Sequence, residues 1–176
     1  AQRLIAQGCT QLVLVDRNAE TGQAATDALN TGAVQARFLQ ADMGDLAAVQ
    51  ALIADAEALA GPINALVNCA GITNRGSILD TSPETWEAIF AVNTRGPFFL
   101  LQAFANRLIG LDKPGGAVNI LSIIAHGGAP ILAPYGASKA ALSHITKNAA
   151  HTLAPHRIRV NGINVGWMDT PGEDAT

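Results

Sequence analysis

The sequence predicts an α/β fold, a doubly wound parallel sheet covered by helices, of which the chain would form an incomplete single domain. Short apolar runs alternate with helical segments along the whole chain, and this order with short connections is typical of parallel sheets. Hydrophobic residues make up 49% and charged residues 14% of the 176 residues, a balance that suits strands covered on both faces. At that length roughly 70% of the unfolded surface can be buried, so a sizeable core is possible.

The first half of the chain begins inside a predicted helix. Residues 1–9 are typical of a helix end that is closed by Gly8. Strands and helices then alternate as strand 11–16, helix 19–30, strand 34–42, helix 45–60 and strand 63–71. The helix 45–60 is expected to end at Gly61 and Pro62.

The second half continues the alternation with longer helices. Its predicted elements are helix 82–110, strand 115–122, a helix from 133 to just before Pro155, and a last buried strand 158–166. Ser82 is the expected N-cap of the first of these helices, with Pro83 in its first position. A bend is expected at Gly96-Pro97.

Charge and composition exclude several classes of protein. The net charge is -3 and the 11 lysines and arginines form no run, so nucleic acid is not an expected partner. No apolar stretch of about 18 residues indicates a membrane span. Cys9 and Cys69 lie beside apolar segments without zinc-site neighbours, so we predict small core residues and no metal site. Without a visible leader the default location is cytoplasmic, although a segment ahead of Ala1 stays open.

Tyr135 and Lys139 lie four residues apart on a predicted helix. Positions i and i+4 share one helix face, so the Lys139 charge can favour the phenolate form of Tyr135. A phenol is otherwise too weak an acid to exchange protons readily at neutral pH. The pair is thus a candidate acid/base, although tyrosine and lysine four apart also occur by chance on amphipathic helices.

Asp16 ends the strand 11–16, where an acid can accept hydrogen bonds from both hydroxyls of an adenosine ribose. Such an acid follows a Gly-rich phosphate loop by about 20 residues, so that loop and the first strand would precede Ala1 and leave a gap in the middle of the sheet. The alternative is an acid that caps the following turn. A carboxylate here favours NAD as the cofactor, because it would repel the extra phosphate of NADP. Arg17 could bind that phosphate, which keeps NADP as the less favoured choice.

Three further stretches with polar residues could face the crevice at the carboxyl ends of the predicted strands, where ligands bind in this fold class. The segment 68–71, Asn-Cys-Ala-Gly, lets a ring or ribose approach the backbone, although a simple turn explains Gly71 equally well. Asn93 lies in an otherwise apolar helix, where a buried amide needs partners. A core asparagine satisfied by its neighbours is the alternative. Ser122 ends strand 115–122, where a hydroxyl can face a ligand or be ordinary polar surface.

These residues follow one another in a particular order: Asn68-Cys69-Ala70-Gly71, Asn93, Ser122, Tyr135-x-x-x-Lys139 and Asn161-x-Ile163-x-Val165-Gly166-x-x-x-Thr170. In this order the chain resembles the short-chain dehydrogenase/reductase family over nearly all of its length. The resemblance implies one Rossmann-like, dinucleotide-binding domain over residues 1–176, without its first strand and C-terminal part. It also implies an NAD-dependent oxidoreductase that acts on a small alcohol or carbonyl compound, as a homodimer or homotetramer.

The resemblance further implies a role for each matching residue. Tyr135 would be the general acid/base, Lys139 would hold the nicotinamide ribose, Ser122 would orient the substrate oxygen, and Asn93 would support a proton relay. Asp42 would face the adenine and Thr170 the carboxamide. The cofactor-binding residues that it implies are Asp16, Arg17, Asp42, Met43, Asn68, Ala70, Gly71, Tyr135, Lys139, Val165 and Thr170.

The chain departs from the family pattern in three places. The Gly-rich loop is absent, Cys69 stands where a second asparagine is commoner, and Val165-Gly166 replaces a Pro-Gly turn. Two other interpretations therefore stay beside the enzyme. One is a non-catalytic nucleotide-binding relative with a regulatory or structural role, and the other is an epimerase or dehydratase of the same fold.

Overall fold

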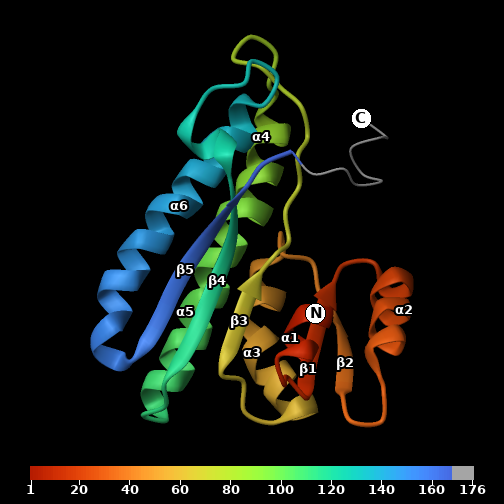
Figure 1. Ribbon diagram of the computed structural model, residues 1–176. Helices are drawn as coiled ribbons and strands as arrows, with labels where there is room; N and C mark the ends of the chain where they lie inside the picture. Colours follow the sequence, from red (N-terminus) through yellow and green to blue (C-terminus); the bar gives the residue numbers. More distant parts are fainter. Residues whose placement is uncertain (168–176) are drawn as a thin grey trace.

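The computed structural model describes residues 1–167. Within them strands and helices alternate as predicted (Figure 1). The strands are β1 (Gln11–Asp16), β2 (Gln35–Gln40), β3 (Ala65–Asn68), β4 (Gly115–Ser122) and β5 (Ile158–Val165). The α-helices are α1 (Gln2–Ala6), α2 (Ala19–Leu29), α3 (Leu46–Ala60), α4 (Pro83–Phe90), α5 (Gly96–Gly110) and α6 (Ala133–Leu153).

All strand pairing is parallel, and the described strands form two sheets rather than one. β1 pairs with β2, and β3, β4 and β5 pair in that order. From the break between β1 and β3, successive strands move outward in opposite directions, which is the doubly wound arrangement (Figure 1). Among residues 1–167 no ladder joins β1 to β3. The break lies where the sequence predicts a gap in the middle of the sheet.

Helix starts follow the capping residues that the sequence offers. Asn18 Oδ1 accepts the Thr21 N–H at 3.0 Å at the start of α2. Ser82 Oγ accepts the Thr85 N–H at 3.2 Å at the start of α4, with Pro83 as its first residue. The predicted cap at Ser82 is therefore confirmed, and it satisfies a backbone donor that the helix itself cannot pair.

Between α4 and α5, directly before the Gly96-Pro97 position at which a bend is predicted, the helix takes a π-helical turn, Ala91–Arg95. Gly96 follows this turn directly. A Cβ on Gly96 would lie 2.5 Å from the Met43 carbonyl oxygen, so only glycine allows the helix to approach the loop after β2 this closely. Single π turns inside α-helices often occur at functional sites, and this one carries Asn93.

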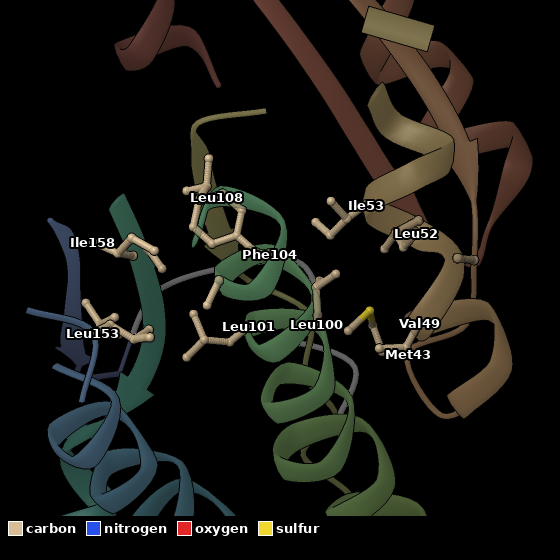
Figure 2. Packing of buried hydrophobic residues seen from close by; sticks show 14 residues of the cluster. Met43, Val49, Leu52, Ile53, Leu100, Leu101, Phe104, Leu108, Leu153 and Ile158 are labelled. Carbon is tan, nitrogen blue, oxygen red and sulfur yellow. The ribbon is translucent and has the colours of Figure 1, made fainter. Parts of the chain in front are cut away.

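The main hydrophobic core lies between α3 and α5 and extends to the end of α6 and the start of β5 (Figure 2). Phe104 at its centre is 0% exposed, as are Val49 on α3 and Ile158 on β5. Each fully buried side chain of this size contributes roughly 1.5–3 kcal/mol. This packing fixes α3 and α5 against the first halves of β4 and β5, which hold Ala117, Ile158 and Val160.

Two expectations from the sequence are wrong. The last strand is predicted to be buried, but β5 is buried only at Ile158 and Val160, and Ile163 is 53% exposed. The hydrophobic core reaches only the first half of this strand. Cys69 is exposed and Cys9 is only partly buried, because both lie in loops just outside the strands rather than in them.

Within residues 1–167, no helix has the length and apolar character that a bilayer span requires.

Candidate active site

Helix α6 places Tyr135 and Lys139 on one face. Lys139 Nζ lies 5.9 Å from the centroid of the Tyr135 ring, which is within the range of a cation–π contact. Tyr135 belongs to the first turn of the helix, which packs on the turn that follows β4. A Cβ on Gly136 would lie 3.1 Å from Ile124 Cγ2, so glycine allows this close packing.

Lys139 is a buried cation. The residue is 4% exposed, and its Nζ donates to the Ile120 carbonyl oxygen at 2.8 Å. Burial lowers the pKa of the Lys139 ammonium below its ordinary value of 10.5, and the nearby Cys69 partly opposes this shift. Among the described residues no carboxylate forms an ion pair with Lys139. An ammonium has three donors, so residues 1–167 leave two of them for hydroxyl groups of a ligand.

The lowered pKa of Lys139 predicts a pH dependence of stability. Between that pKa and 10.5 the unfolded chain holds more protons than the folded one, so the free energy of unfolding rises with pH. We expect the wild type to gain stability relative to Lys139→Met as the pH rises from about 7 to about 10. Urea unfolding at several pH values measures this difference.

A matched variant on the same helix controls for the loss of one positive charge. Lys147 is exposed, and Lys147→Met makes the same chemical change without removing a buried group. A difference between wild type and Lys139→Met that stays constant, or falls, as the pH rises would contradict the assignment of Lys139 as a desolvated cation.

Asn93 is 0% exposed in the π turn. Its Oδ1 accepts the Ile72 N–H at 2.8 Å, and its Nδ2 donates to the Ile72 carbonyl oxygen at 2.9 Å. Nδ2 also donates to Ser138 Oγ at 3.1 Å. The amide is thus satisfied by its neighbours, which was the alternative at this position, and it holds the main chain directly after the segment 68–71. Its part in a proton relay stays a prediction.

Two predicted catalytic side chains, Asn93 and Lys139, approach the main chain of Gly71 closely. A Cβ built on Gly71 would lie 3.3 Å from Asn93 Oδ1 and 3.4 Å from Lys139 Nζ. Glycine therefore leaves an exposed stretch of main chain beside the buried ammonium. The structure brings Tyr135, Lys139, Asn93 and Gly71 to one place at the carboxyl edge of β3 and β4.

Ser122 ends β4 and pairs in register with Val165 of β5. It is 5% exposed, and its Oγ accepts the Ile124 N–H at 3.3 Å. The carbonyl that binds Lys139 belongs to Ile120, two residues earlier on the same strand. That Ser122 and Tyr135 share a substrate oxygen stays a prediction, and Thr170 lies outside the described residues.

The residues expected near adenosine lie at the carboxyl ends of β1 and β2, in the two-stranded sheet. A hollow of about 660 Å³ at the ends of β1 and β2 is lined by Arg17, Asn18, Gln40, Ala41, Asp42, Asp45 and Ala48. Asp16 is exposed beside it, and its Oδ1 accepts the Asn18 N–H at 2.8 Å. Asp16 therefore caps the turn. Its second oxygen has no partner among residues 1–167, so the same carboxylate can also accept from a ligand.

Two predicted cofactor residues direct their side chains inward. Met43 packs in the core close to Leu100 of α5 (Figure 2), so it could reach a cofactor only through its main chain. Asn68 is 5% exposed and donates from Nδ2 to Asn119 Oδ1 at 2.8 Å. Ala70, by contrast, lies exposed in the loop after β3. The cofactor role of all three stays a prediction.

Sequence reasoning missed the buried polar residues that organise the site. Asn119 donates from Nδ2 to Thr146 Oγ1 at 2.8 Å and so ties β4 to α6. Ser138 bonds to both Asn93 and Tyr135. A signal was present in each case, because Asn119 interrupts an apolar strand and Ser138 stands directly before Lys139. Polar residues at such positions need partners when they are buried.

The whole chain, residues 1–176, matches the family model described as short chain dehydrogenase. The chain belongs to this family. It is 36% identical to cyclopentanol dehydrogenase of Comamonas sp. (strain NCIMB 9872), over 96% of the chain and 67% of that protein. It is 37% identical to carbonyl reductase (NADPH) 2 of Sus scrofa, over 70% of the chain and 49% of that protein. The solved structure of an NAD+-bound xylitol dehydrogenase is similar with a TM-score of 0.90 at 31% identity, covering 97% of the chain and 65% of that structure.

These short-chain dehydrogenase relatives confirm the family resemblance and the fold class. The chain spans about half to two thirds of their length, which agrees with the divided sheet and with an incomplete domain. One relative is named for NADPH and another was solved with NAD+. Both nicotinamide dinucleotides are therefore represented among proteins similar to this chain.

Proposed function

We propose that the chain is the dinucleotide-binding and catalytic domain of an oxidoreductase that transfers a hydride between NAD(H) and a secondary alcohol or ketone. One observation carries this proposal: a buried ammonium, Lys139, lies 5.9 Å from the centroid of the Tyr135 ring on the same helix. A phenol beside a desolvated cation is suited to proton transfer at neutral pH. Membership of the short-chain dehydrogenase family supports the same chemistry.

In this proposal Tyr135 and Ser122 act on the substrate oxygen, Lys139 binds the dinucleotide, and Asn93 supports the site from behind the loop after β3. The Tyr135 hydroxyl gives a proton to the carbonyl oxygen in reduction, and its deprotonated oxygen takes one from the alcohol in oxidation. Ser122 donates a hydrogen bond that orients the substrate oxygen. The donors of Lys139 that the described residues leave unused bind ribose hydroxyls. Asn93 holds the main chain after Gly71 and in this way supports a water-mediated proton relay. The bound nicotinamide supplies the hydride chemistry.

The residues present fit a nicotinamide dinucleotide at two separate places. Gly71 leaves room beside Lys139 Nζ that a Cβ would occupy, which suits the nicotinamide ribose. The hollow lined by Arg17 and Asp42, with the Asp16 carboxylate beside it, suits the adenosine. Val165 and, by its position in the motif, Thr170 would contact the nicotinamide end.

A non-catalytic relative that only binds a nucleotide is the second candidate. Burial of the Lys139 charge with no carboxylate partner among residues 1–167 argues against it, because such burial costs stability and is retained where chemistry needs it. A third candidate uses the same residues for epimerisation or dehydration around a bound dinucleotide. Its product would show no net oxidation or reduction.

The absorbance of the reduced nicotinamide tests the three candidates. The full-length protein would be mixed with NAD(H) or NADP(H) and a panel of secondary alcohols and ketones. The proposed function predicts a change in absorbance that requires both substrate and dinucleotide. Dinucleotide binding without turnover would favour the second candidate, and a rearranged product at constant absorbance would favour the third.

Asp16 is expected to select NAD over NADP. The carboxylate is exposed, so its repulsion of a phosphate 4 Å away is near the value in water, about 1 kcal/mol. We therefore expect Asp16→Ala to raise kcat/KM with NADP relative to NAD by about fivefold. Steady-state kinetics with both dinucleotides in the full-length protein measures this ratio.

Two further variants distinguish an effect of the Asp16 charge from an effect of the hydrogen bond by which Asp16 caps the turn. Asp16→Asn keeps an oxygen that can accept the Asn18 N–H and should raise the NADP ratio as Asp16→Ala does. Glu20→Gln removes an exposed acid from the start of α2 and should leave the ratio unchanged. Preference for NADP in the unmutated protein, or no change in either Asp16 variant, would leave Asp16 as a turn cap only.

The protein is also proposed to act as a homodimer or homotetramer. Trp86 on α4 and Phe98 on α5 are each 41% exposed, and Trp86 stacks on Phe90 with centroids 4.5 Å apart. Exposed aromatic side chains of this kind favour an interface between protein copies. Sedimentation of the full-length protein tests this association.

A further inference from the structure

Ser138 forms hydrogen bonds in two directions from inside the site. The residue is 0% exposed on α6. Its Oγ donates to the Tyr135 carbonyl oxygen at 2.7 Å and accepts from Asn93 Nδ2 at 3.1 Å. A hydroxyl has only one donor, and the Tyr135 carbonyl oxygen uses it. Toward Asn93, therefore, Ser138 can act only as an acceptor.

This restriction selects the orientation of the Asn93 amide. The NH2 end must face Ser138, which leaves Oδ1 to accept the Ile72 N–H at 2.8 Å. With the amide reversed, Oδ1 would face a hydroxyl that has no donor left, and the Ile72 N–H would face an NH2 group. The Ile72 carbonyl oxygen, which accepts from Nδ2 at 2.9 Å, requires the same orientation. The Ser138 hydroxyl therefore reinforces the way in which Asn93 binds the main chain that follows Gly71.

A second bond joins the same two segments. Thr94 Oγ1 donates to the Ser138 carbonyl oxygen at 3.1 Å. Consecutive residues of the π turn, Asn93 and Thr94, therefore bind the side chain and the main chain of Ser138. Ser138 thus joins the first turn of α6 to the π turn, and Asn93 of that turn binds the loop after β3.

We propose that Ser138 is a positioning residue that keeps the Tyr135 turn, the Asn93 amide and the Ile72 main chain in one arrangement. It acts through Asn93 and Tyr135 and makes no contact with substrate. Its effect on turnover rests on the proposed function. Its effect on the Ile72 main chain does not, because the hydrogen bonds that carry it lie within the chain.

The test compares Ser138→Ala with Ser143→Ala in the full-length protein. Ser143 is 6% exposed on the same helix, so this control also removes a buried hydroxyl. Hydrogen exchange at the Ile72 amide reports directly on its bond to Asn93. Exchange should become about tenfold faster in Ser138→Ala, the change expected for loss of one hydrogen bond, and should stay unchanged in Ser143→Ala.

Kinetics provides the second readout. In Ser138→Ala, kcat should fall about tenfold while the KM for the dinucleotide stays within about twofold, because Lys139 is untouched. Ser138→Thr keeps the hydroxyl and should restore both readouts. Buried threonines of this chain already donate to a carbonyl oxygen in the preceding turn of their own helix, Thr26 to Gly22 at 2.9 Å and Thr146 to Leu142 at 2.7 Å.

Several results would overturn the proposal. One is unchanged Ile72 exchange in Ser138→Ala, another is an equal rise in Ser143→Ala, and a third is unchanged kcat in an otherwise active protein. If the wild type shows no turnover at all, the proposed function fails, and Ile72 exchange alone decides the role of Ser138. If Ser138→Ala does not fold, Thr94→Val must accelerate Ile72 exchange, because it removes the other bond between the same segments.

Discussion

Replacing Tyr135 by phenylalanine is expected to reduce turnover by about a hundredfold to ten-thousandfold, the usual contribution of a general acid/base. The ring and its position 5.9 Å from Lys139 Nζ are kept, and only the ionisable oxygen is lost. Among residues 1–167 the Tyr135 hydroxyl has no hydrogen-bond partner, so its removal breaks no internal bond of this part of the chain. The dissociation constant of the dinucleotide should therefore stay within about twofold of the wild type.

The measurement pairs turnover with dinucleotide binding in the full-length protein. Turnover is followed by the absorbance of the reduced nicotinamide, and binding by its fluorescence. A variant that binds and does not turn over supports Tyr135 as the acid/base. Turnover near the wild-type rate would remove Tyr135 from the mechanism, and loss of binding would mean that the hydroxyl holds the dinucleotide instead.

Replacing Lys139 by methionine is expected to damage both turnover and binding. The methionine stem fills most of the buried volume, so no large cavity forms. The ammonium and its two available donors are lost, which should weaken dinucleotide binding about tenfold, as for loss of a hydrogen bond to a charged group. Turnover should fall by a further factor of about a hundred, because the cation proposed to assist the Tyr135 acid/base is lost.

Lys147→Met is the matched control, since Lys147 is an exposed residue of the same helix. It should leave both constants near the wild-type values. Titration with NAD(H) and initial rates at saturating dinucleotide separate the two effects. Unchanged affinity in Lys139→Met would contradict the ribose contact, and unchanged turnover would contradict the influence of Lys139 on Tyr135.

The elements themselves could be predicted because their signals are local. Alternating apolar runs and helical segments indicated each strand and α-helix, and Ser82-Pro83 indicated where α4 begins. A bend at Gly96-Pro97 was expected, but the π-helical turn directly before it was not. A π turn depends on what the helix must contact, in this case the Met43 main chain and Ile72, and these lie outside the helix.

The candidate site was predicted only in part, for a related reason. The family motif identified Tyr135, Lys139 and Asn93 by position, yet it did not show that Met43 turns into the core or that Cys69 is exposed. Just after a strand, the direction of a side chain depends on the path of the loop. That path follows from packing that no short segment contains.

The sequence by itself determined the order and type of the elements, the family, and the residues at which proton transfer is proposed, because each of these depends on short patterns or on ordered motifs. Only the tertiary structure decided how those residues are held. Asn93 binds Ile72, 21 positions away, and Ser138, 45 positions away. Lys139 becomes a desolvated cation only when the strand that carries Ile120 packs against its helix. Partners this far apart in the chain meet only after folding, and burial of a charge is a property of everything that surrounds it.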